Sequence, residues 1–477
     1  MKDFQTQIQR IKEKLAAAKT ADKDFKVFGS NSHKYQLNPP IAMKTVEDFE
    51  QKHQVSLPIE YKLFVTEIGN GGISHDNSGA GPYYGIFPFG EEFQILFNDW
   101  DQHQLTSSHL LYPKMSDEFW TKKVENLDGE EVTEDEYEKR EAELFGGIFI
   151  IGTQGCTYFH GLVINGEFAG RVINIDMDHQ KPKFSYEANF LDWYEHWLDD
   201  VIDGNLSDDD SGSFGYQMGG SEENLLELYE NSTDNDTKLD ALNGLLFKKH
   251  LTEHTTHEIQ NYLYDQTPEI QSVVYRLLMK HDYETAKMYL NSLFIHNLNE
   301  AVKLLHWYGK EHKKEWIDTV QIYLREVKDE ETFRFATYIL QEDPDLNFED
   351  LKAFATHENA DIRKQTFYTF SFLKDKSNYE KEFLIGLDAE NPNELIEVLQ
   401  AIEGLKTKAI LKKLQELVNK YPYKKVKPDK DGFRHYTDST EDLVYITSNL
   451  ESVLKEYGLD HKSVANLDID NFDLNGK

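Results

Sequence analysis

Two kinds of hydrophobic pattern divide the chain. Up to about residue 203, short apolar runs alternate with turn residues, whereas beyond about residue 222 apolar residues recur at helical spacing. The first pattern is typical of a sheet with flanking helices, and the second of an all-helical domain. The sequence therefore predicts an α+β domain with a central antiparallel or mixed sheet, followed by an all-α solenoid.

One stretch, LPIEYKLFVTEIGNGG, organises the first domain. Its proline, Pro58, suits the first turn of a helix, where an N–H group would have no partner. Glycine and asparagine at the end of the stretch tolerate a left-handed backbone, so we expect the helix to stop there. The apolar residues spaced for one face of this helix are Ile59, Leu63, Phe64 and Ile68.

The clearest strand pattern follows between Gly147 and Asp176. Residues 148–151, 158–164 and 171–176 are predicted strands, and Asn165-Gly166 is a favoured hairpin turn between the last two. After them, a helix is expected from Asn189 to Val201. Its apolar residues, which would pack on the sheet, are Phe190, Trp193, Trp197 and Val201.

These elements, in this order, resemble the SUKH superfamily, which includes the fungal cell-wall-assembly regulator domain and many bacterial immunity proteins of polymorphic toxin systems. The resemblance covers roughly residues 40–203. It implies a SUKH-like domain over residues 1–203, with a charged insert at 116–146, that acts by binding another protein. The residues that carry the family pattern are Pro58, Tyr61, Gly69, Asn70, Gly71, Gly72, Gly147, Gly152, Gly166 and Trp193.

The helical half of the chain is repetitive. Equivalent helix positions are separated by 31, 31, 32, 29 and 33 residues, and this steady period predicts stacked helix pairs of a HEAT-like solenoid over residues 223–423. Residues 204–222, rich in glycine, serine and aspartate, are predicted to be a flexible linker. Residues 424–477 are expected to hold one helix and an acidic tail. The equivalent positions are Leu239, Ile270, Ala301, Phe333, Ile362 and Leu395.

Charge and cysteine content narrow the function. The 477 residues carry a net charge of −35, which disfavours nucleic acid or anionic lipid as a partner and suits a basic protein. One cysteine, Cys156, excludes an internal disulfide and fits a reducing compartment. With neither a signal-peptide pattern nor an apolar run long enough to span a bilayer, the sequence predicts a cytoplasmic protein with no membrane partner.

Two groups of residues resemble catalytic patterns. The string from His250 to His254 matches H-x-x-E-H, an inverted zinc-peptidase pattern, but it lies between repeat helices, where a solvated surface cluster is the simpler interpretation. Cys156 and His160 would be about 13 Å apart on a strand, too far for proton transfer, so we expect a buried cysteine. We predict no enzyme activity and no cofactor.

The leading hypothesis is an immunity protein that binds and neutralises a cognate toxin domain, and a toxin of the basic nuclease class would suit the negative charge. The alternatives are an intracellular scaffold or regulator that binds an endogenous partner, and a metal-dependent hydrolase that uses the His250 region. The sequence leaves open the identity of the partner, the binding surface, the oligomeric state, the orientation of the two domains and the role of the solenoid. Either tryptophan of the predicted helix would serve as an anchor if it were exposed. The candidate partner-binding residues are Trp193, Trp197, Asp199, Asp200, Asp203, Tyr83 and Tyr84.

Overall fold

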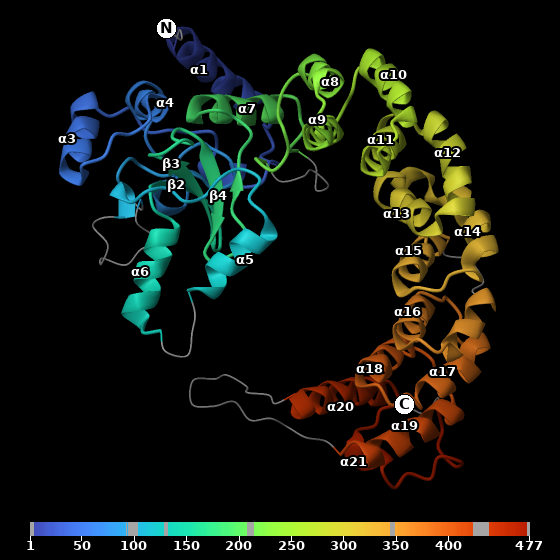
Figure 1. The fold of residues 1–477 in the computed structure, drawn as a ribbon. Helices are drawn as coiled ribbons and strands as arrows, with labels where there is room; N and C mark the ends of the chain where they lie inside the picture. Colours follow the sequence, from blue (N-terminus) through green and yellow to red (C-terminus); the bar gives the residue numbers. More distant parts are fainter. Residues whose placement is uncertain are drawn as a thin grey trace. The chain divides into compact units, whose positions relative to one another are not determined.

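A computed structural model gives the fold of the chain (Figure 1). It describes residues 4–91, 93, 104–127, 132–207, 214–343, 349–422 and 438–474. The described structure divides into two compact units, Met1–Leu277 and Leu278–Lys477. The predicted domain limits were drawn from the period of the sequence repeats, whereas these units are defined by compactness. The predicted limits therefore stay a prediction.

A five-stranded antiparallel sheet lies at the centre of the first unit, with its strands in the order β1-β2-β3-β4-β5. This confirms the predicted α+β class. Strands β3 and β4 pair from Tyr158 opposite Asp176 to Leu162 opposite Val172, so their connection is longer than a two-residue hairpin at Asn165-Gly166. The Asn165 side chain instead binds the loop before α5, where it accepts from the His109 amide at 3.0 Å. The strands are β1 (Gly85–Ile86), β2 (Ile148–Gly155), β3 (Tyr158–Val163), β4 (Val172–Asp176) and β5 (Lys183–Phe184).

Helices cover both faces of this sheet (Figure 1). One face packs under α7, α4 and α1 in a core that includes Phe149, Trp193 and Trp197. The opposite face packs under α5 and α6 from the charged insert, which bury Trp120 and Leu144 there. The helices of this layer system are α1 (Phe4–Ala21), α2 (Ser30–His33), α3 (Met43–His53), α4 (Ile59–Leu63), α5 (Asp117–Glu125), α6 (Glu134–Leu144) and α7 (Phe190–Ile202).

The organising stretch forms a helix after Pro58, but its phase differs from the prediction. Helix α4 continues as a π-helix, η1 (Phe64–Ile68), so the wider turn rotates the face that meets the core. Tyr61, Phe64 and Val65 are buried, whereas Ile59 is 43% exposed. At the helix end only Gly71 is left-handed, with φ of +63°.

The family-pattern residues of the SUKH-like stretch hold the backbone in close contacts. A Cβ atom on Gly152 would lie 2.4 Å from the carbonyl oxygen of Gly85, so a side chain there would force β1 from β2. Asn70 fixes the exit of the stretch, since its Oδ1 accepts from the Phe89 amide at 2.6 Å. Tyr61 packs edge to face on Phe190 of α7, with the ring centroids 5.2 Å apart.

Further helices of the first unit follow α7. They are α8 (Glu222–Asn231), α9 (Asn235–Phe247), α10 (Glu253–Asn261) and α11 (Pro268–His281). Residues 208–213 of the predicted linker, with its acidic run Asp208 to Asp210, lie outside the described residues. Beyond them, Phe214 is buried against Trp193, with the ring centroids 5.8 Å apart, so part of this segment is anchored on α7.

The second unit confirms the predicted solenoid class. Helix pairs stack one after another, so that α13, α15, α16, α18 and α20 lie side by side (Figure 1). Ala301, Phe333, Ile362 and Leu395 fall on the second helix of successive pairs, and all four are fully buried. The helices are α12 (Tyr283–His296), α13 (Leu298–Tyr308), α14 (Ile317–Leu324), α15 (Glu330–Leu340), α16 (Ala360–Ser371), α17 (Glu380–Gly386), α18 (Pro392–Ala401), α19 (Lys408–Lys420), α20 (Asp438–Glu456) and α21 (His461–Val464).

Candidate protein-binding site

The two tryptophans proposed as anchors lie inside the first unit. Helix α7 begins at the cap Asn189, whose side chain accepts from the Asp192 amide, and its apolar face meets the sheet. Trp193 and Trp197 are each 0% exposed. An anchor must reach the surface, so neither indole meets the condition set for that role, and both are core residues.

Tyr83 and Tyr84 join an aromatic surface that the sequence did not reveal. Phe28, 59% exposed, lies with its ring centroid 6.0 Å from Tyr83 and 5.3 Å from Tyr84. The exposed His75 contacts Tyr84 from the other side, with the centroids 5.0 Å apart. We call these four residues the aromatic patch. Exposed aromatic clusters of this kind are common in protein interfaces.

The aromatic patch depends on a close backbone contact at Gly29. This residue has φ of +81°, and a Cβ atom there would lie 1.9 Å from the carbonyl oxygen of Tyr83. Gly29→Ala should therefore cost about 3–5 kcal/mol, since a left-handed alanine costs about 1–2 kcal/mol before the clash is added. The measurement is the urea unfolding midpoint of the first unit.

A matched control for this prediction is Gly166→Ala. Gly166 has φ of +75°, but the nearest atom to its added Cβ is the Cβ of His109 at 3.8 Å, an ordinary contact. This variant should be destabilised only by the cost of a left-handed alanine, about 1–2 kcal/mol. Equal losses in the two variants would contradict the steric argument.

A charged triad, in which Asp200 is buried and His196 and Glu187 are partly buried, connects the aromatic patch to the acidic end of α7. Tyr83 donates from its hydroxyl to the carbonyl oxygen of Phe214 at 3.2 Å, and the Phe214 ring lies 5.2 Å from the His196 ring. His196 stands between two carboxylates, with Nδ1 2.7 Å from Oε1 of Glu187 and Nε2 3.0 Å from Oδ2 of Asp200. Burial alone would lower the pKa of His196, but Asp200 and Glu187 outweigh it and raise the pKa to about 10. The triad is therefore charged near neutral pH, with one positive and two negative groups.

Helix α1 neutralises the outer face of α7. The Arg10 guanidinium binds Glu195 through two nitrogens, and Lys14 lies within 2.8 Å of Glu195 and 2.6 Å of Asp199. Burial would raise the pKa of Glu195, but Arg10, Lys14 and Gln7 lower it to about 2. Asp199 is thus paired with a lysine, whereas the predicted candidate Asp203 at the end of the helix is exposed.

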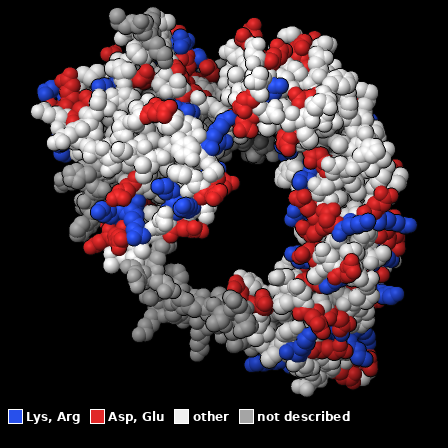
Figure 2. Space-filling model, in the orientation of Figure 1, with Lys and Arg blue, Asp and Glu red and all other residues white. Residues whose placement is uncertain are grey.

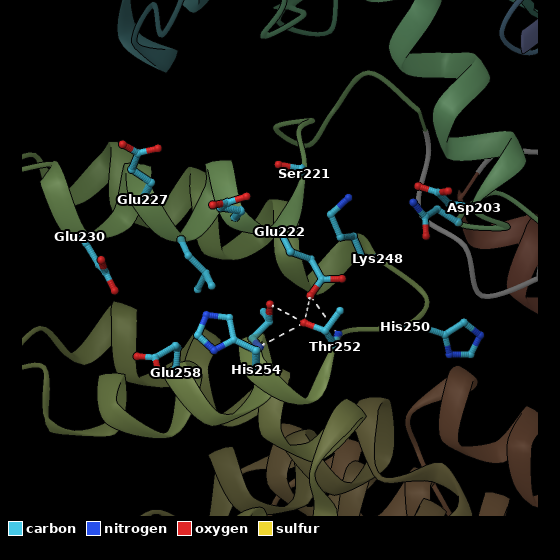
Figure 3. Close-up of a pocket in the computed structure, with 14 residues that line it drawn as sticks. Asp203, Ser221, Glu222, Glu227, Glu230, Lys248, His250, Thr252, His254 and Glu258 are labelled. Atoms are coloured by element: carbon cyan, nitrogen blue, oxygen red, sulfur yellow. Dashed lines mark hydrogen bonds between the residues drawn. The ribbon is translucent and has the colours of Figure 1, made fainter.

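Asp203 opens into a cleft of about 1130 Å³ between α8, α10 and the end of α7 (Figure 3). Leu226 contributes an apolar surface, and the basic groups among the described lining residues are Lys248, His250 and His254. We call this feature the acidic cleft. Its carboxylates are Asp203, Glu222, Glu223, Glu227, Glu230 and Glu258.

Hydrogen bonds hold the acidic cleft together at Glu222. Its Oε2 accepts from the Thr252 amide at 2.9 Å and from the Thr252 hydroxyl at 2.8 Å, which ties α8 to the first turn of α10 (Figure 3). The exposed Glu223 and Glu227 lie one helical turn apart on α8. Carboxylates concentrated on one concave surface attract cationic groups and repel anionic ones.

The two histidines of the H-x-x-E-H string lie apart in this cleft. His254 is on α10, whereas His250 precedes the helix, and the two point away from each other on either side of Thr252 (Figure 3). Over the residues that the structure describes, no group of three or more His, Cys, Asp or Glu side chains is placed to hold a metal ion. Cys156 is exposed in the turn between β2 and β3, so its predicted burial is wrong.

The negative charge of the chain is concentrated around the acidic cleft. Residues 1–277 contain 23 basic and 49 acidic residues, a net charge of −26 out of −35, and residues 187–258 alone contain 18 acidic and 3 basic residues. Acidic side chains gather over α8 and α10 (Figure 2). Sequence reasoning missed this part of the site because it assigned α8 and α10 to linker and repeats. The spacing of Glu223, Glu227 and Glu230 on one helical face was the available signal.

Comparison with known proteins identifies one region. Residues 40–196 match the model of the SMI1 / KNR4 family (SUKH-1). The matched residues include the sheet, α3, α4 and the first half of α7. No curated protein and no solved structure matches the chain. Among the described helices, none has both the length and the apolar content needed to cross a membrane.

Proposed function

We propose, from the match of residues 40–196 to the SMI1 / KNR4 family (SUKH-1), that the chain is an immunity protein whose first unit binds a basic toxin domain. The family is consistent with an immunity-type or a regulatory role, and it is generally non-catalytic. In this proposal the protein acts in the cytoplasm by steric block, and it needs no cofactor.

The observation that carries the proposal is the acidic cleft. Six carboxylates line one concave surface next to the SUKH domain, and only one lysine accompanies them among the described lining residues. A basic polypeptide would gain from this field both in the rate of encounter and in the orientation of docking. Many nucleases are basic because they bind phosphates, so a toxin of this class would fit.

The aromatic patch supplies a second contact in the same unit. Its rings offer apolar area with little side-chain entropy to lose, whereas the cleft offers charge, and strong interfaces combine a desolvated aromatic centre with complementary charge around it. Phe28→Ala should weaken binding, because it removes an exposed ring of the aromatic patch. The loss of this exposed ring leaves no cavity in the core, so the fold should not change.

Co-expression tests the proposal. The full chain is expressed together with the toxin domain encoded beside its gene, and growth rescue and a stable complex on purification are the expected results. A complex with an endogenous protein in place of the toxin, and no growth rescue, would favour the regulatory role instead. Binding that leaves growth inhibited would contradict neutralisation.

A further inference from the structure

The second unit carries an unbroken row of aromatic rings across three stacked helices. From α13 to α16, the ring centroids of successive residues lie 5.9, 6.1, 6.2 and 5.3 Å apart. Helices α13, α15 and α16 follow one another in the stack (Figure 1). We call this row the aromatic ladder, and its members are Trp307, Phe335, Tyr338, Tyr368 and Phe372.

The ladder repeats with the period of the solenoid. Trp307, Tyr338 and Tyr368 are 31 and 30 residues apart, and each follows a basic residue by four positions. Its two ends are open to solvent, with Trp307 55% and Phe372 52% exposed. Core packing explains neither exposure, since the fully buried residues of the same helices, Ala301 and Ile362, lie on another face. Phe335 itself is buried beneath the row, so Trp307, Tyr338, Tyr368 and Phe372 form its accessible part. Exposed aromatic rings grouped in this way mark a binding site.

Three basic residues beside the ladder are already paired. Lys303 lies 3.2 Å from Glu331, Arg334 lies 3.4 Å from Glu330, and Lys364 lies 3.9 Å from Asp361. Burial, with Lys313 and Lys310 nearby, lowers the pKa of His306 to about 4, so this ring is neutral where it touches Phe335 and Tyr338. An anionic occupant would have to break these pairs, whereas an uncharged one would not.

The ladder also offers hydrogen-bond donors without partners. Among the described residues, no protein group forms a hydrogen bond with the hydroxyls of Tyr338 and Tyr368 or with the indole N–H of Trp307. Glu330 and Glu331, which could accept from an incoming backbone, are engaged by basic residues. The surface therefore suits an occupant that brings carbonyl acceptors and few N–H donors.

We propose that the aromatic ladder binds an extended, uncharged, proline-rich segment of a partner protein. Proline has no N–H group, its carbonyls remain free in the polyproline II conformation, and its rings pack on aromatic faces. The segment would run across α13, α15 and α16, with its carbonyls accepting from Trp307, Tyr338 and Tyr368. This inference is independent of the toxin-binding proposal, because it concerns the other unit and a different chemistry.

Binding of a labelled, blocked proline decapeptide to the full chain tests the proposal by fluorescence anisotropy. Trp307→Ala should weaken it at least about tenfold, as expected for an exposed interface tryptophan. The double variant Tyr338→Phe with Tyr368→Phe keeps both rings and should weaken it about fivefold for each hydrogen bond lost. Its thermal unfolding should match that of the wild type, because these hydroxyls have no partner to lose.

Control probes separate the alternatives. A glycine-serine decapeptide and a lysine decapeptide should not bind, and Tyr445→Ala on α20, an exposed tyrosine outside the ladder, should leave proline binding unchanged. Preference for the lysine peptide would overturn the proposal in favour of a cationic partner. Self-association that Trp307→Ala abolishes would overturn it in favour of a second copy, and the absence of any proline binding would overturn it outright.

Discussion

Replacing Glu223 and Glu227 together by lysine should weaken toxin binding about 100-fold or more, because like charges across an interface cost several kcal/mol and 1.4 kcal/mol is tenfold. Both side chains are exposed on α8 in the acidic cleft, so the change should leave the fold intact. The net charge would move from −35 to −31. Binding is measured by interferometry with the purified toxin domain at several salt concentrations.

The matched control reverses two carboxylates elsewhere in the same unit. Glu47 on α3 and Glu67 on η1 are exposed, and their replacement by lysine gives the same net charge. This variant should weaken toxin binding only slightly, through the loss of long-range electrostatic attraction. Salt screens this attraction over about 10 Å at 0.1 M. If both double variants weaken binding equally, net charge acts and not the cleft, and the proposed site is wrong.

The repeat period made the solenoid predictable from sequence. Its signal is carried by Ala301, Phe333, Ile362 and Leu395, which are all fully buried on equivalent helices. A repeat period can be recognised without knowing which helices pack together, because each helix pair buries the same face against its neighbours. The strand pattern of β3 and β4 was predictable for a similar reason, since hydrophobic strand runs separated by turn residues are local signals.

Predictions failed where a local deviation changed the geometry. Helix α4 continues as the π-helix η1, so a helical spacing rule, which assumes a uniform turn, does not hold from Ile59 to Ile68. Cys156 adopts φ of +51° in the turn between β2 and β3, where its side chain is exposed and not buried as predicted. Neither deviation has a clear signature in a single sequence.

The candidate site was likewise predictable only in part. The acidic end of α7 was visible in the sequence, because Asp199, Asp200 and Asp203 are close along one helix. Their different environments were not visible, since Lys14 on α1 pairs with Asp199 and His196 pairs with Asp200. The aromatic patch needed the fold as well, because Phe28 and Tyr84 are far apart in sequence and in contact in space.

His196→Gln should destabilise the first unit by about 3–5 kcal/mol at pH 7, the typical cost of removing one partner of a buried ion pair. The variant leaves Glu187 and Asp200 facing each other with no positive charge between them, where the imidazolium now lies 2.7 and 3.0 Å from their oxygens. Protection of the α7 amides in hydrogen exchange measures the loss, because it reports the opening of this unit alone.

The pH dependence distinguishes the charge from the shape of the His196 ring. The folded-state pKa is about 10 and the ordinary value is 6.5, so the stabilisation is complete below pH 6.5 and is lost as the pH rises through 10. Between these limits wild-type stability should fall by about 1.4 kcal/mol per pH unit relative to His196→Gln. His75→Gln, which leaves the His196 triad intact, is the control variant in the same unit. A gap between wild type and His196→Gln that stays constant from pH 6 to 10 would mean that packing, and not the imidazolium, holds this end of α7.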